Sequence, residues 1–173
     1  RHSVAVSDRV ALLGNPNTGK TTIFNSLCGV RAKTSNFPGT TTAIRLGHYR
    51  TGDQQTNAMD LPGVYELTMD APEAQIARDA LAGVRGPAPG AIVVVVDACN
   101  LTRNLVLVGE LLDHPQPVVI ALNMVDLAAR RGVTIDAKTL SQRLGVTVVP
   151  TVARRGIGLD DLRAAIAASL AAP

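Results

Sequence analysis

The sequence predicts an α/β fold in which a mostly parallel, six-stranded sheet carries helices on both faces. Strand-like apolar runs alternate with helical patterns along the chain, which is typical of a parallel sheet covered by helices. The run at residues 91–96 contains no polar residue, as expected of a central strand buried on both faces. The 173 residues fit one compact domain, so we expect a single domain over residues 1–173.

The strands are expected where short apolar runs are bounded by turn residues, and the helices where apolar positions recur with helical spacing. The expected strands are residues 10–13, 43–49, 56–59, 91–96, 118–122 and 146–149. The expected helices are residues 20–27, 71–82, 101–112, 136–144 and 159–170. Arg1 to Arg9 are expected to form a flexible lead-in, and residues 29–42, which include Pro38 and Gly39, a mobile loop.

Composition excludes several classes of protein. Apolar residues make up 46% of the chain and charged residues 18%, so disorder is not expected, and 2% aromatic residues imply an aliphatic core. The formal charge of +3 is spread along the chain, so no nucleic-acid partner is expected. Cys28 and Cys99 form no metal-ligand or disulfide pattern. No apolar run approaches the length of a membrane helix, so the chain shown is expected to be soluble.

Residues 14–21 fit the phosphate-loop pattern G-x-x-x-x-G-K-[ST] and directly follow an expected strand. The glycines let successive backbone N–H groups point at an anion, and the following helix adds the positive end of its dipole. Lys20 is expected to reach the β- and γ-phosphates and Thr21 to bind Mg²⁺. The expected nucleotide-binding residues here are Gly14, Asn15, Pro16, Asn17, Thr18, Gly19, Lys20, Thr21 and Thr22. This motif alone does not separate ATP from GTP.

Asp60, Leu61, Pro62 and Gly63 form a D-x-x-G tetrapeptide at the end of an expected strand. At that position the Asp60 carboxylate can hold the water shell of Mg²⁺, and the Gly63 N–H can meet the γ-phosphate. The next residue is Val64, whose aliphatic side chain cannot orient a water molecule. We therefore expect slow hydrolysis that depends on backbone groups, with Lys20 and Gly63 taking part in catalysis.

Asn123, Met124, Val125 and Asp126 form an N-x-x-D motif after another expected strand. The Asp126 carboxylate can accept hydrogen bonds from N1–H and the exocyclic amine of guanine, a pair that adenine does not offer. A phosphate loop, a D-x-x-G and an N-x-x-D in this order predict a Ras-like P-loop GTPase that selects GTP.

Two further segments carry a narrower signal: Asn-Phe-Pro-Gly-Thr-Thr at residues 36–41 and Val-Asp-Ala-Cys-Asn-Leu-Thr-Arg-Asn-Leu at residues 96–105. With the three motifs above, they resemble the N-terminal G domain of bacterial ferrous iron transport protein B, from about residue 10 to residue 170. The resemblance implies a GTPase domain on the cytoplasmic side of the bacterial inner membrane. It also implies a helical domain and a membrane transport domain beyond these residues, the latter as a partner in the same protein; self-association stays an open question.

The resemblance also implies roles for individual residues. Thr41 is expected to bind Mg²⁺ in the GTP state and to take part in catalysis. Because Thr40 and Thr42 adjoin it, the threonine with this role could be either neighbour. Gly39 and Thr40 are expected to lie at the nucleotide. Asn17 is expected to help bind K⁺, and Ala153 to contact guanine. Phe37 stands where many members carry Trp, and Thr151 and Arg154 depart from the Ser-Ala-Lys-like loop around Ala153.

Two alternative functions stay open at this point. Ribosome-assembly and RNA-modification GTPases share the Gly14-Asn15-Pro16-Asn17 start of the phosphate loop, and the basic charge permits that interpretation. No dense Lys/Arg stripe supports it. A GTP-controlled switch that barely hydrolyses its nucleotide is the other alternative.

Overall fold

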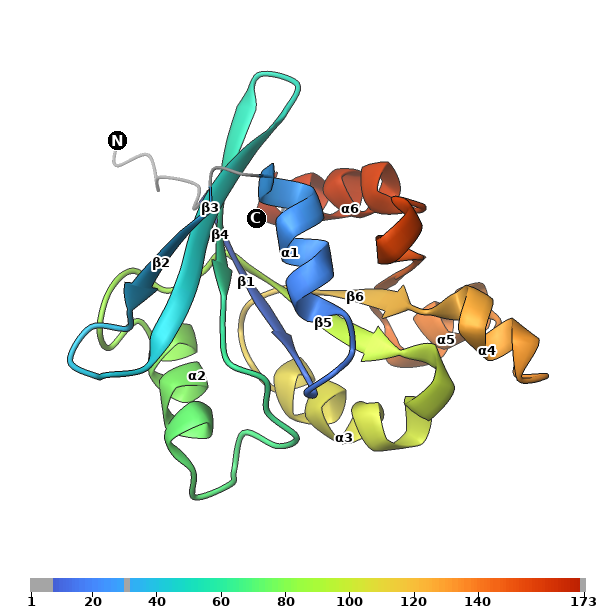
Figure 1. The fold of residues 1–173 in the computed structure, drawn as a ribbon, viewed down its shortest axis with the longest axis horizontal. Helices are drawn as coiled ribbons and strands as arrows, with labels where there is room; N and C mark the ends of the chain where they lie inside the picture. Colours follow the sequence, from blue (N-terminus) through green and yellow to red (C-terminus); the bar gives the residue numbers. More distant parts are fainter. Residues whose placement is uncertain (1–7, 30–31, 172–173) are drawn as a thin grey trace.

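The structure is a computed structural model that describes residues 8–29 and 32–171. The described residues form one seven-stranded sheet in the order β2-β3-β4-β1-β5-β6-β7 (Figure 1). The strands are β1 Arg9–Gly14, β2 Lys33–Asn36, β3 Ala43–Thr51, β4 Gln54–Asp60, β5 Ala91–Asp97, β6 Val118–Asn123 and β7 Thr147–Pro150. β2 and β4 pair antiparallel with β3, and all other pairs are parallel. The fold is therefore the predicted α/β class.

The predicted count of six strands was wrong, because the stretch at residues 29–42 contains the additional edge strand β2. All four side chains of β2 are exposed, so the strand has no apolar pattern, and it is held by its pairing with β3. Residues 30 and 31 of that stretch lie outside the described residues. The predicted lead-in at Arg1 to Arg9 also lies outside them up to residue 7, and its last residue, Arg9, begins β1.

Six α-helices cover the sheet within the described part of the chain: α1 Lys20–Cys28, α2 Pro72–Ala82, α3 Leu101–Leu112, α4 Val125–Arg130, α5 Ala137–Leu144 and α6 Leu159–Ala171. Two short 3-10 turns occur at η2 Ala98–Asn100 and η3 Ala153–Arg155. The short helix α4 was not predicted; it begins directly after Met124, whose backbone is left-handed. The other five helices begin and end within one residue of their predicted positions.

The two faces of the sheet bury separate apolar clusters. Phe24 of α1 and Ile166 of α6 pack with Leu12 and Val93 on one face, and α2 and α3 pack on the other, as Figure 1 shows. The parallel strands β1, β4, β5, β6 and β7 consequently end at one edge of the sheet, which is where such folds bind ligands. Within the described ranges, no helix has the length and apolarity needed to cross a membrane.

Candidate nucleotide-binding site

The phosphate loop connects β1 to α1 and turns through two left-handed residues. Asn17 has φ of 65° and Gly19 has φ of 86°. A Cβ on Gly19 would collide with the Asn123 side-chain amide, so this position requires glycine for space as well as for conformation. The loop borders a cavity of about 470 Å³. Its lining residues are Asn15, Pro16, Asn17, Gly19, Lys20, Thr21 and Gly63.

Lys20 and Asp60 come together at the floor of this site. The Lys20 ammonium donates a hydrogen bond to Asp60 Oδ1, and both side chains are nearly buried, at 11% and 7% exposed. A buried charge is tolerated when it is paired, so each group holds the other at the carboxyl edge of the sheet. The structure thus brings together the lysine and the carboxylate that the first two motifs predict, 40 residues apart in the chain.

The D-x-x-G segment is tied to the phosphate loop through its backbone. The Val64 N–H donates to the Gly14 carbonyl oxygen at 3.0 Å, and a Cβ on Gly63 would lie 3.2 Å from Pro16 Cα. The Val64 side chain is 5% exposed and belongs to the core cluster beneath α2 and α3. It therefore packs in the interior, which agrees with the expectation that it orients no water.

Asn123 joins the phosphate loop to the loop after β7. Its Nδ2 donates to the Thr18 carbonyl oxygen at 3.0 Å. Its Oδ1 accepts from Thr151 Oγ1 and from the Ala153 N–H, both at 3.0 Å. The side chain is 3% exposed, so these bonds satisfy a buried amide and fix three segments relative to one another.

Asp126 faces a cavity of about 210 Å³ next to this junction. The cavity is lined by Gly19, Thr22, Asn123, Met124, Asp126, Leu127, Val152, Ala153 and Arg154. Asp126 Oδ2 lies 3.6 Å from Arg154 Nη2, which is too long for a hydrogen bond. No donor in the described part of the chain bonds this oxygen, although the side chain is only 17% exposed. A nearly buried acceptor at a cavity is a group that a ligand donor can satisfy.

The loop at residues 37–42, which carries the predicted switch threonine, lies elsewhere. Figure 1 shows the β2–β3 connection beside α2, away from the β1–α1 turn. Among the described residues, those lining the two cavities include neither Gly39, Thr40 nor Thr41. Thr41 is exposed, and none of these three residues lines the cavity that Lys20 borders.

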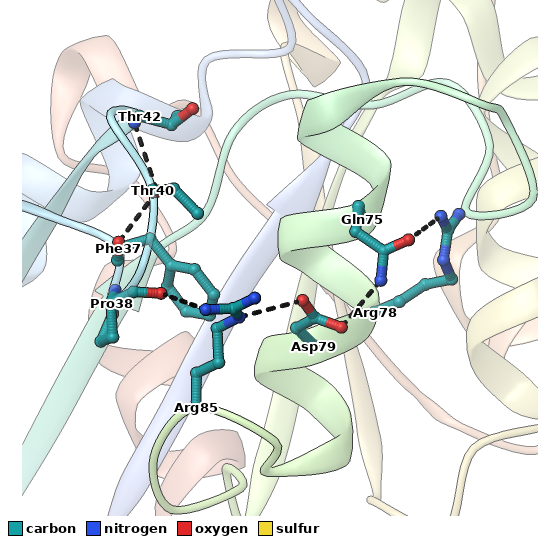
Figure 2. A network of polar contacts seen from close by, with 8 residues as sticks. All are labelled: Phe37, Pro38, Thr40, Thr42, Gln75, Arg78, Asp79 and Arg85. Carbon is teal, nitrogen blue, oxygen red and sulfur yellow. Dashed lines mark hydrogen bonds and ion pairs between the residues drawn. The ribbon is translucent and has the colours of Figure 1, made fainter.

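Polar contacts hold the 37–42 loop in this position (Figure 2). Thr40 Oγ1 donates to the Phe37 carbonyl oxygen at 2.8 Å, and the Phe37 ring is buried in the core cluster with α2. Arg85, in the loop after α2, donates from Nη1 to the Pro38 carbonyl oxygen at 3.2 Å. Its Nε lies 3.4 Å from Asp79 Oδ2 of α2. The loop is thereby fastened to α2 by groups that the motifs did not single out.

The 96–105 segment builds the junction between β5 and α3. Asp97 accepts from the Cys99 N–H at 2.8 Å and from Asn100 Nδ2 at 3.0 Å. Asn104 accepts from the Asp97 N–H at 3.3 Å and donates to the Asn100 carbonyl oxygen at 2.8 Å. Asp97, Asn100 and Asn104 thus cap and brace the turn between β5 and α3.

Neither thiol is a candidate nucleophile. Burial raises the pKa of Cys28 to about 11 and also raises the pKa of Cys99, so both are protonated at neutral pH. Over residues 8–29 and 32–171, no three His, Cys, Asp or Glu side chains cluster to form a metal site.

Two residues of these contacts were missed from the sequence. Arg154 takes the place of a lysine in the degenerate loop, and its cationic character was the available signal for a partner of Asp126. Arg85 follows a helix in an ordinary glycine- and proline-rich turn, and nothing in its neighbourhood marks it.

Comparison with known proteins decides the family. A family model described as ferrous iron transport protein B matches residues 8–166. The chain belongs to this family. FeoB relatives include an Fe(2+) transport protein A/FeoB fusion protein of Porphyromonas gingivalis, 45% identical over 89% of this chain and 18% of that one. The Salmonella typhimurium Fe(2+) transporter FeoB is 42% identical over 91% of this chain and 20% of its own. The chain spans about a fifth of the length of these curated relatives.

Solved FeoB structures share the fold. The G domain of the T. maritima FeoB iron transporter has a TM-score of 0.86 at 34% identity, covering 93% of this chain and 97% of that one. A mutant of S. thermophilus NFeoB bound to GDP has a TM-score of 0.86 at 40% identity, covering 93% of this chain and 62% of that one. Membership in the FeoB family does not favour the alternative of a ribosome-assembly or RNA-modification GTPase.

Proposed function

We propose that this chain binds GTP and hydrolyses it slowly, as the cytoplasmic G domain of a ferrous iron transporter. The observation that carries the proposal is a buried side chain that joins two loops beside a carboxylate oxygen that a ligand can reach. Asn123 holds the phosphate loop against the loop after β7, and Asp126 Oδ2 lies in the adjacent cavity without a hydrogen-bond donor from the described residues. The relatives, an Fe(2+) transporter and a protein bound to GDP, support the cargo and the nucleotide.

The phosphate cavity fits a triphosphate with its cations. Lys20 and Thr21 line it, and Asp60 pairs with Lys20, so the site offers the ammonium, hydroxyl and carboxylate that Mg²⁺–phosphate sites use. In the proposal Thr21 and Asp60 hold Mg²⁺, directly or through water, and exposed Asn17 holds K⁺. When bound, these ions supply positive charge against the phosphate oxygens.

The chain's own groups have separate tasks in hydrolysis. Lys20 leaves its pairing with Asp60 in favour of the phosphates, and the Gly63 backbone N–H donates to the terminal phosphate. Thr41 joins the site only after the 37–42 loop has left α2. Because no side chain orients the attacking water, turnover is expected to be slow.

Calorimetry with GTP, GDP and ATP in the presence of Mg²⁺ tests the binding proposal. GTP and GDP should bind and ATP should bind at least about 100-fold more weakly, because adenine leaves the Asp126 carboxylate unpaired. Equal affinity for ATP and GTP would contradict the proposal.

The variant Asp126→Asn sharpens the test. An amide in this place donates where the carboxylate accepts, so it fits the 2-oxo group of xanthine better than the 2-amino group of guanine. We expect GTP binding to weaken by about 100-fold and xanthosine triphosphate binding to improve. Asp161→Asn, an exposed acidic residue on α6, is the matched control and should change neither. Loss of both nucleotides would show that Asp126 acts on stability and not on the base.

Hydrolysis is tested by phosphate release in K⁺ and in Na⁺. Faster release in K⁺ that disappears in Asn17→Ala supports the proposed cation role. Equal rates in both salts remove Asn17 from the site. GTP affinity without measurable turnover would contradict the proposed hydrolysis and would indicate a nearly non-hydrolysing switch instead.

A further inference from the structure

A second and larger cavity lies behind the 37–42 loop. Its volume is about 640 Å³, within the usual range for sites that bind small organic molecules. Its walls come from β2, β3 and β4, from the 37–42 loop and from the turn after α2. Among the described residues, it shares no lining residue with the two nucleotide cavities.

The charged residues among the described lining of this cavity are all basic. Arg9, Lys33 and Arg85 line it together with His48, and no Asp or Glu is among the described lining residues. Arg9 donates to the Pro87 carbonyl oxygen, and Arg85 is partly neutralised by Asp79 from α2. Lys33 projects from the exposed strand β2. A cavity lined by cations and by no acid attracts an anion.

Apart from Thr34, Ser35 and Asn57, the remaining lining of the cavity is largely apolar. Ile44, Leu46 and Met59 of the sheet, with Ala80 of α2 and Pro87, supply most of it. Leu46 is 40% exposed, so its side chain is available to an occupant of the cavity. An occupant with an acidic group and an apolar body could pair with the basic side chains and pack against the apolar ones.

The occupant would also touch the loop that must move. Phe37 and Pro38 line the cavity, and the same loop carries Thr40 and Thr41. Arg85 both lines the cavity and bonds the Pro38 carbonyl oxygen (Figure 2). A ligand here would contact the loop in its position against α2 and would lose those contacts when the loop moves to the nucleotide.

We propose that this cavity binds a small organic anion, a carboxylate, phosphate or sulfonate on an apolar body, and so stabilises the 37–42 loop away from the nucleotide. The second half of the proposal rests on the proposed function. Coupling between two sites is reciprocal. A bound GTP analogue therefore lowers the affinity for the anion, and the bound anion lowers the affinity for the GTP analogue by the same factor. GDP, which has no γ-phosphate to draw in Thr41, leaves the anion's affinity unchanged.

The probe for the test is 8-anilinonaphthalene-1-sulfonate, and its uncharged analogue N-phenyl-1-naphthylamine is the control ligand. Fluorescence titration of the chain should show one saturable site for the sulfonate. Lys33→Glu reverses one charge at the cavity and should weaken the sulfonate by about tenfold while leaving the uncharged probe unchanged. Leu46→Glu adds a carboxylate to the cavity wall and should also weaken sulfonate binding.

Lys138→Glu makes the same charge change on α5 and is the matched control, with parental affinity expected. Equal sulfonate affinity in the parent, Lys33→Glu and Leu46→Glu overturns the site, as does the absence of saturable binding. Displacement of the sulfonate by GDP also overturns it, since that result places the probe in the nucleotide cavity.

A non-hydrolysable GTP analogue then tests the coupling. The coupling is supported if the sulfonate binds severalfold more weakly with the analogue and shows no such weakening with GDP. It is overturned if the sulfonate affinity is the same with and without the analogue. A failure of the proposed function is distinguishable: the chain would then bind no GTP analogue, while the Lys33-dependent sulfonate site would persist.

Discussion

The guanine end of the site and the 37–42 loop differ in how they are held. At the guanine end, the buried Asn123 side chain makes three hydrogen bonds to three separate segments, and Asp126 already faces its cavity. The 37–42 loop is held away from the phosphate cavity by bonds at the partly exposed Arg85 and by the buried Phe37 ring. Under the proposed function, the group that selects the base is already in place, while catalysis requires the loop to move.

The difference follows from what each region must do. A base-reading group discriminates best when the protein holds it rigidly, because a misfitting base then leaves a buried acceptor unpaired. A loop that reports on the γ-phosphate needs two positions of similar free energy, so that a few kcal/mol from the ligand can exchange them. Partly exposed contacts of modest strength suit that requirement.

The largest expected effect comes from Asn123→Ala, which removes the side chain that joins the segments at the guanine end. The substitution leaves the Thr18 carbonyl, the Thr151 hydroxyl and the Ala153 N–H without their partner. We expect a loss of about 2–4 kcal/mol in the free energy of unfolding and a loss of GTP and GDP affinity of about 100-fold or more. Chemical denaturation and calorimetry measure the two quantities.

Asn25→Ala is the matched control, because Asn25 lies exposed on α1 and only its backbone is used in the helix end. It should leave both quantities unchanged. Parental GTP affinity in a folded Asn123→Ala variant would show that the junction does not organise the site.

A smaller effect is expected from Arg85→Met, which loosens the attachment of the 37–42 loop to α2. The change removes the bonds to the Pro38 carbonyl and to Asp79 but keeps an extended apolar side chain. Because partly exposed polar contacts contribute about 0.5–1 kcal/mol, affinity for a GTP analogue should rise by about two- to fivefold. GDP affinity should stay unchanged, since GDP does not require the loop.

Arg50→Met is the control for this variant, because Arg50 bonds only the Asp53 carbonyl within the β3–β4 hairpin among the contacts described. If Arg85→Met altered GDP and the GTP analogue equally, the loop would not be the element that distinguishes the two nucleotides.

The smallest effect is expected far from both regions, at the start of α5. Asp136 accepts hydrogen bonds from Thr139 and Lys138, and these bonds hold the pKa of its carboxyl below the ordinary value of 3.8. A lowered pKa in the folded state adds stability above the ordinary pKa, and this stability disappears as the pH falls through the folded value. Asp136→Ala should therefore melt slightly lower than the parent at pH 7, and the difference in thermal scans should shrink as the pH falls through the lowered pKa of Asp136. Nucleotide affinity should not change.

Much of the fold could be predicted because the sequence marks it with apolar runs. Residues 91–96 and 118–122 are buried throughout, and the observed strands extend the predicted ones by a single residue. β2 escaped prediction because its residues, Lys-Thr-Ser-Asn, are all exposed and the strand exists only through pairing with β3. α4 is too short for a helical period to be visible.

The site could be predicted only where a motif supplies both the chemistry and the position. Asp60 and Asn123 end β4 and β6, and Lys20 and Asp126 lie in the first turns of the helices after β1 and β6, so the parallel sheet brings them to one edge. The position of the 37–42 loop depends on Arg85, which contacts Pro38 across 47 residues of sequence. A contact of that kind leaves no local pattern, and so the sequence predicted a loop near the phosphates where the structure has it against α2.

Hydrogen exchange at single amides tests the contrast between the two regions most directly. The Ala153 N–H, bonded to Asn123, and the Phe37 N–H, bonded to the Thr42 carbonyl at 2.9 Å, can be followed in the same sample with GDP and with a non-hydrolysable GTP analogue. Ala153 should be protected equally with both nucleotides, while the exchange rate at Phe37 should change only with the GTP analogue. An unchanged Phe37 amide with the GTP analogue bound, or an Ala153 amide that responds to the third phosphate, would contradict the division into a preassembled guanine end and a movable loop.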